Sequence, residues 1–125
     1  AALPRCSTLR ELYLRNNGIG DAGIAALAGA LPQCLEQLGL EGNKIREAGA
    51  AALAAQLPRC PALARLYLSD NEAGEAGAAE LAGALPHCAA LRTLTLFGNG
   101  VGQAGGRRLR AVAPDLDLHI EAGAH

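Results

Sequence analysis

LRELYLRNNGI, residues 9–19, decides the fold, because the same spacing of leucines, asparagine and a final apolar residue occurs four times in the chain. It returns as LEQLGLEGNKI at 35–45, LARLYLSDNEA at 63–73 and LRTLTLFGNGV at 91–101. A glycine and an alanine-rich stretch follow each copy. Recurrence at this period indicates a repeat architecture. We expect repeats near 9–34, 35–62, 63–90 and 91–114, with a terminal strand near 116–120.

The two halves of each repeat predict different secondary structure. Apolar and variable residues alternate around Leu12 and its equivalents, as in a short strand. After the asparagine, Gly23, Leu27 and Leu31 recur every four residues, which is the spacing of one helix face. The helices are expected to begin just after a polar residue and to end at a proline. The polar residues expected just ahead of the helices are Asp21, Glu47, Glu75 and Gln103, and the prolines expected to end them are Pro32, Pro58 and Pro86.

Stacking such units predicts an α/β horseshoe. Parallel strands lie about 4.8 Å apart, whereas helix axes prefer about 8–10 Å. The array therefore bends, with a concave parallel sheet inside and convex helices outside. The asparagines at the strand ends are expected to be buried and to bond backbone groups that the turn leaves unpaired. These residues are Asn17, Asn43, Asn71 and Asn99.

The repeated string resembles the leucine-rich repeat family, whose signature is L-x-x-L-x-L-x-x-N/C-x-L. The repeat length and the full helix per repeat look like the ribonuclease-inhibitor subtype, which also occurs in NLR innate-immune receptors and in Ran GTPase-activating proteins. The resemblance covers essentially the whole chain and implies a solenoid of about four repeats. We interpret residues 1–125 as one such domain, a fragment of a longer chain, because Leu3-Pro4-Arg5-Cys6 matches the end of a repeat.

Composition and motifs argue against several classes of function. The formal net charge of −1 gives no electrostatic basis for binding nucleic acid or an anionic membrane. The stretch Gly18 to Gly23 matches G-x-G-x-x-G, but the repeat explains it, and the unit lacks the crossover of a dinucleotide-binding fold. No pairing of nucleophile and base stands out. We predict a protein that is not an enzyme, with no cofactor and no metal site.

The four cysteines occur once per repeat, at Cys6, Cys34, Cys60 and Cys88. With no C-x-x-C pair, the pattern favours reduced thiols that pack as small apolar side chains, with oxidation of neighbouring thiols as a secondary hypothesis. Reduced thiols indicate a reducing compartment, so we expect a cytoplasmic location.

The residues beside the inward leucines are predicted to form the concave surface. All three aromatic residues of the chain fall there, and exposed aromatic side chains are typical interface anchors. Mixed charges favour a protein partner over a polyanion. The candidate partner-binding residues are Tyr13, Arg15, Glu41, Arg65, Tyr67, Asp70 and Phe97.

The function predicted from this surface is protein–protein interaction. The resemblance implies, as one role, the ligand-sensing or regulatory part of an NLR-like protein. The alternatives are a regulator of an enzyme, as a GTPase activator or a ribonuclease-inhibitor-like inhibitor, and a structural segment of a larger assembly.

Overall fold

The computed structural model describes residues 9–120, in which short strands alternate with helices. The strands are β1 (Glu11–Tyr13), β2 (Gln37–Gly39), β3 (Arg65–Tyr67), β4 (Thr93–Thr95) and β5 (Asp117–His119). The α-helices are α1 (Gly20–Ala28), α2 (Glu47–Gln56), α3 (Gly74–Ala84) and α4 (Gly102–Val112). Two 3₁₀ helices, η1 (Leu57–Arg59) and η2 (Leu85–His87), continue α2 and α3.

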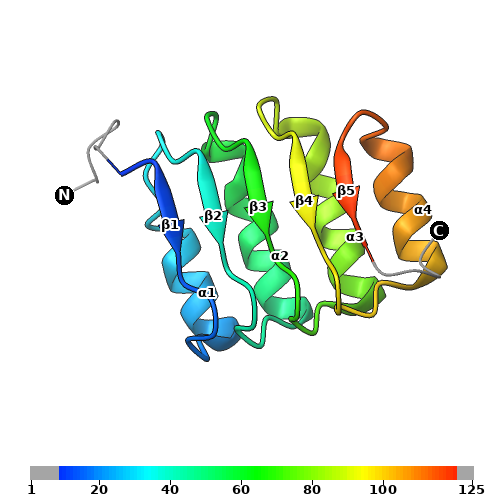
Figure 1. Cartoon of the computed structure of the whole chain (residues 1–125), viewed down its shortest axis with the longest axis horizontal. Coiled ribbons are helices and arrows are strands. Elements are labelled where there is room, and N and C mark those ends of the chain that lie inside the picture. Colours follow the sequence, from blue (N-terminus) through cyan, green and yellow to red (C-terminus); the bar gives the residue numbers. More distant parts are fainter. Residues whose placement is uncertain (1–8, 121–125) are drawn as a thin grey trace.

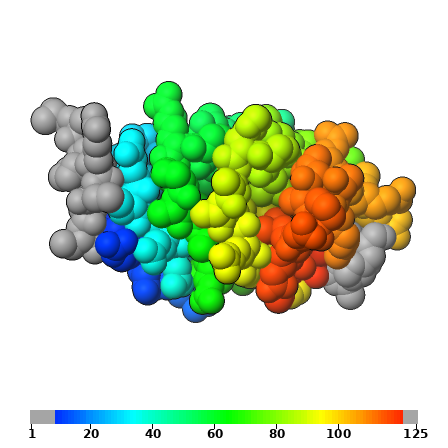
Figure 2. All heavy atoms as spheres, turned by 90° about the horizontal axis from the view of Figure 1, so that it is seen from above, coloured from blue at the N-terminus to red at the C-terminus, as the bar shows by residue number. Residues whose placement is uncertain are grey.

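All five strands form one parallel sheet in the order of the sequence. The strands lie side by side in one layer with the helices behind them (Figure 1). In the space-filling view the repeats follow one another as slabs along the long axis (Figure 2). The predicted α/β solenoid with a parallel sheet is therefore confirmed.

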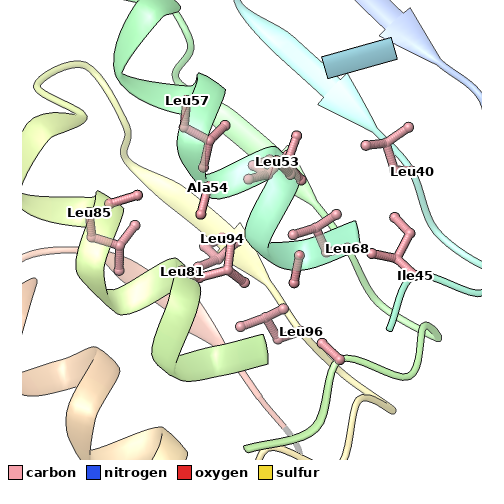
Figure 3. Close-up of a cluster of buried hydrophobic side chains, with 14 of the residues drawn as sticks. Leu40, Ile45, Leu53, Ala54, Leu57, Leu68, Leu81, Leu85, Leu94 and Leu96 are labelled. Carbon is pink, nitrogen blue, oxygen red and sulfur yellow. The ribbon is translucent and has the colours of Figure 1, made fainter. Parts of the chain in front are cut away.

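The core lies between the two layers and is built from leucine and alanine. Leu38, Leu66 and Leu94 are fully buried and pair with one another in the strand register. Leucines of α2 and α3 point toward strand and loop residues of the same core (Figure 3). Small residues let neighbouring helices approach closely: a Cβ added at Gly77 would lie 3.3 Å from the Cβ of Ala50. This explains why the core uses so few aromatic residues.

The asparagines bond across repeats, and three of the four are buried as predicted. Asn71 Oδ1 accepts from the backbone N–H groups of Asn43 at 2.8 Å and Ile45 at 3.0 Å, while its Nδ2 donates to the carbonyls of Leu40 and Leu68. Asn43 and Asn99 are buried in the same way. The prediction of burial is wrong for Asn17, which is exposed because it belongs to the first described repeat, at the edge of the sheet.

The helix ends differ from the sequence-based prediction. Asp21 lies inside the first turn of α1 and not ahead of it, and its Oδ1 accepts from the backbone N–H groups of Arg46 and Gly49 at 2.8 and 3.0 Å. It therefore caps the next helix, α2, where a carboxylate also suits the helix dipole. Helix α1 ends four residues before Pro32, at Ala28. The other two prolines lie within η1 and η2, because proline is tolerated in the first turn of a helix.

The backbone position just before the repeated asparagine is left-handed in all four repeats. Just after each of the first four strands, φ is 57° at Asn16, 66° at Gly42, 59° at Asp70 and 71° at Gly98. Glycine, asparagine and aspartate are the residues that tolerate this region. The position therefore has a conformational reason for its residue types, including the candidate binding residue Asp70.

Candidate functional site: the open sheet face

The side of the sheet that points away from the helices, here called the open sheet face, carries side chains in three rows. The strand register aligns a first row of Glu11, Gln37, Arg65, Thr93 and Asp117, and a second row of Tyr13, Gly39, Tyr67, Thr95 and His119. Backbone hydrogen bonds continue past the strand ends, for example from Asp70 N–H to the Phe97 carbonyl. These bonds align a third row of Arg15, Glu41, Ser69 and Phe97.

The Tyr13 ring lies over Gly39 of the neighbouring strand. A Cβ at Gly39 would lie only 2.7 Å from Tyr13 Cδ1, so the ring needs glycine beneath it. Its hydroxyl lies 2.8 Å from Gln37 Oε1 and 3.0 Å from Glu11 Oε1, and its one proton can be donated to either oxygen. Tyr13 remains 52% exposed. The aromatic surface is thus held flat on the sheet and stays available for contact.

Electrostatic interactions connect Tyr13 to the third strand. Desolvation, followed by the hydrogen bond and charge of Glu11, raises the pKa of the Tyr13 hydroxyl. Tyr67 raises this pKa further, whereas the Arg65 guanidinium lowers it. Side chains of β1 and β3 therefore interact across Gly39, and the first three strands share one polar and aromatic cluster.

A second cluster occupies the other end of the face. The Phe97 and His119 rings have centroids 5.9 Å apart with an interplanar angle of 59°. His119 Nε2 lies 3.1 Å from Asp117 Oδ2, and the Phe97 N–H donates to Ser69 Oγ at 3.1 Å. Phe97 is 46% exposed, so its ring is supported on one side and open on the other.

The structure places all seven candidate residues on or beside the open sheet face. Tyr13, Arg15, Arg65, Asp70 and Phe97 are exposed, while Glu41 and Tyr67 are half-buried. Tyr13, Arg65 and Tyr67 are brought together by the register. Phe97 lies apart from them and pairs with His119.

Sequence reasoning did not single out Arg92, which precedes β4 and lies outside the alternating strand pattern. Arg92 and Arg65 line one shallow hollow of about 390 Å³, together with Glu36, Gln37, Ala64, Ala89 and Ala90. A larger groove of about 500 Å³ lies beside the last repeat, lined by Leu85, Cys88, Leu91, Arg92, Val112, Ala113, Pro114, Asp115 and Leu116. It forms where the connection from α4 to β5 is shorter than the connection from α3 to β4.

The cysteines do not all behave as predicted. Cys34 is disulfide-bonded, so the prediction of reduced thiols is wrong there. Cys60 and Cys88 are free, and burial raises the pKa of both thiols. Cys60 is buried, whereas Cys88 borders the groove and is only half-buried. Cys6 lies outside the described residues.

Within residues 9–120, no group of three or more His, Cys, Asp or Glu side chains is arranged to hold a metal ion. In the same range, no helix is both long and apolar enough to cross a membrane.

A family model described as Leucine Rich repeat matches residues 5–28. The same spacing recurs in the three following repeats, and each recurrence forms the same strand, buried leucines and helix. The family model and the recurring spacing together identify leucine-rich repeats in this chain. No curated protein sequence matches this leucine-rich repeat chain.

Two solved structures have a similar fold. The leucine-rich repeat chain is similar to a structure titled Leiomodin-1 Actin-Binding Site 2, with a TM-score of 0.80 and 16% identity over 90% of this chain and 70% of that one. It is also similar to the tropomodulin C-terminal domain of Caenorhabditis elegans, with a TM-score of 0.79 and 16% identity over 91% and 74% of the two chains. At 16% sequence identity, these comparisons show a similar fold and nothing about function.

Proposed function

We propose that this leucine-rich repeat chain is a non-catalytic module that binds another protein on its open sheet face. The observation that carries the proposal is the position of the aromatic residues. The core is built almost entirely from leucine and alanine, yet Tyr13, Tyr67 and Phe97 all project from the sheet on the side opposite the helices. Large aromatic side chains at a surface are typical centres of protein interfaces.

The shape of the face suits a protein segment better than a small molecule. The exposed aromatic rings are spread over the rows from β1 to the end of β4, and the hollow between the arginines is shallow. Charges of both signs are interspersed, with Glu11, Arg65 and Asp117 in the first row. Such a pattern favours a partner of matched mixed polarity.

More specific roles can be proposed for this protein-binding module. A ligand-sensing or regulatory part of an NLR-like protein, and the ribonuclease-inhibitor-like subtype, are supported by the repeat pattern. Actin is a second partner to test, because one similar structure is titled as an actin-binding site. A cytoplasmic location is supported by the free thiols of Cys60 and Cys88, while the disulfide at Cys34 counts against it.

The test places a photoreactive phenylalanine analogue at position 67, in place of Tyr67. A second variant carries the same analogue in place of Glu80 on the helix layer and is the matched control. A partner that crosslinks only from position 67 is then purified, and its affinity is measured for the wild-type chain, Phe97→Ala and Glu80→Ala. The affinity of actin for the same three chains is measured in parallel. We expect Phe97→Ala to weaken binding at least tenfold, or about 1.4 kcal/mol, and Glu80→Ala to leave it unchanged. Equal crosslinking from both positions, or loss of binding with Glu80→Ala alone, would contradict the proposal.

A further inference from the structure

We propose that the hollow between Arg65 and Arg92 binds the carboxylate of an aspartate or glutamate side chain on the partner protein, next to the aromatic surface. This inference rests on the proposed function and assigns the chemistry of one contact within it. The hollow has a volume of about 390 Å³, and its lining includes Ala64, which precedes β3, and Ala89 and Ala90, which lie in the turn before β4.

The two guanidinium groups have no anionic partner within the described residues. Ion pairs in residues 9–120 involve Arg10 with Glu36, Arg46 with Glu72, and His119 with Asp117, and no side-chain hydrogen bond is made by Arg65 or Arg92. Both arginines are exposed. Two unpaired cations that border one hollow create a local positive potential, which attracts a negatively charged group.

The acid on the rim of the hollow is already neutralised. Glu36 Oε2 lies 2.9 Å from Arg10 Nη1, on the side of the hollow away from Arg92. Without Arg10, Glu36 would compete for the guanidinium groups of the hollow. With it, Arg65 and Arg92 are left for a ligand.

Gln37 adds a neutral polar side chain. Its Oε1 lies 2.8 Å from the Tyr13 hydroxyl. Gln37 lines the hollow, and its NH₂ group has no acceptor within the described residues. A planar carboxylate accepts strong hydrogen bonds from guanidinium N–H groups and can accept a further one from an amide N–H.

The position of the hollow specifies what surrounds the acid. Arg65 and Tyr67 are alternate residues of β3 and point to the same side of the sheet. A segment that places a carboxylate between the arginines therefore lies with its neighbouring residues on Tyr67 and toward Phe97. We infer that the partner segment carries an acidic residue beside apolar residues.

The test uses a displayed library of random peptides fused to the carrier at their C-termini, so that any carboxylate selected is a side chain. Selection on the wild-type chain is expected to enrich an aspartate or glutamate beside apolar residues. Arg65→Gln and Arg92→Gln should each weaken a selected peptide about tenfold. Arg108→Gln on the exposed side of α4 is the matched control and should have no effect. Thermal unfolding of each variant checks that the fold is unchanged.

The results separate this inference from the proposed function. Selected peptides that lose binding with Tyr67→Ala but show no acidic preference would overturn the carboxylate site and leave the open sheet face as the binding surface. Peptides indifferent to Tyr67→Ala would overturn both. Arg92→Glu should shift selection from acidic to basic residues, and continued selection of acids by this variant would refute the charge argument. Displacement of the peptides by a single-stranded oligonucleotide at equal concentration would also refute it.

Discussion

Replacing Asn71 with alanine tests the cross-repeat asparagine bonds, and its effect can be worked out bond by bond. Asn71 Nδ2 donates to the carbonyls of Leu40 and Leu68, and each of these carbonyls keeps another donor in the variant. Leu40 also accepts from Asn43 Nδ2, and Leu68 also accepts from Asn99 Nδ2. The two buried N–H groups, of Asn43 and Ile45, lose their acceptor. An orphaned buried donor costs about 1–3 kcal/mol.

Two such donors give about 2–6 kcal/mol before relaxation. The alanine variant no longer buries an amide, which offsets part of this cost, so we expect the free energy of unfolding to fall by about 2–4 kcal/mol. Urea unfolding followed by far-ultraviolet circular dichroism measures it. This size is a large fraction of the stability of a small domain, so the shift in midpoint is easily resolved.

Asn17→Ala is the matched control, because it changes the same residue at the same repeat position. Asn17 is exposed, and its Nδ2 donates to the carbonyls of Leu14 and Arg15. Water can replace such bonds, so we expect a loss below about 1 kcal/mol. If Asn71→Ala and Asn17→Ala lowered the unfolding free energy equally, burial of the asparagines would not be what stabilises the stack.

The remaining predictions concern helix packing and the thiols. Gly49→Ala is expected to destabilise the chain by about 1–3 kcal/mol, because the added Cβ would lie 2.5 Å from Asp21 Oδ1. At Gly83 an added Cβ meets no atom within 4 Å, so Gly83→Ala should stabilise the chain by about 0.5–1 kcal/mol. Thermal melts that ranked the two variants in the opposite order would contradict the close helix contact. Alkylation followed by mass spectrometry should label Cys88 before Cys60, and both more slowly than a free thiol at neutral pH, because a raised pKa leaves less thiolate until the pH rises. Equal labelling rates at the two sites would show that the groove does not admit the reagent.

The spacing of leucine and asparagine was enough to predict the strands, their inward leucines and the burial of three of the four asparagines. This information is local, because each three-residue strand has one inward residue, and that residue is a leucine. The residues on either side of this leucine point outward, which predicted the positions of the aromatic side chains. What the spacing could not predict is how one repeat acts on another: Asp21 caps a helix of the next repeat, and the Tyr13 ring lies on Gly39.

The hollow between Arg65 and Arg92 was missed for a related reason. Arg92 lies outside the strand alternation, and its proximity to Arg65 arises only when β3 and β4 are paired. Periodicity describes one repeat at a time, so properties that need two repeats require coordinates.

The strand register also shows where this chain tolerates changes in length. Paired central leucines of successive strands are separated by 26, 28, 28 and 24 residues, yet every pairing is in phase. The shorter first spacing accompanies a shorter helix, α1, and the shortest spacing accompanies a shorter connection from α4 to β5. Both changes lie away from the strands. Residues can therefore be gained or lost there without moving a row of the open sheet face, so repeats of different length can be exchanged while that face keeps its register.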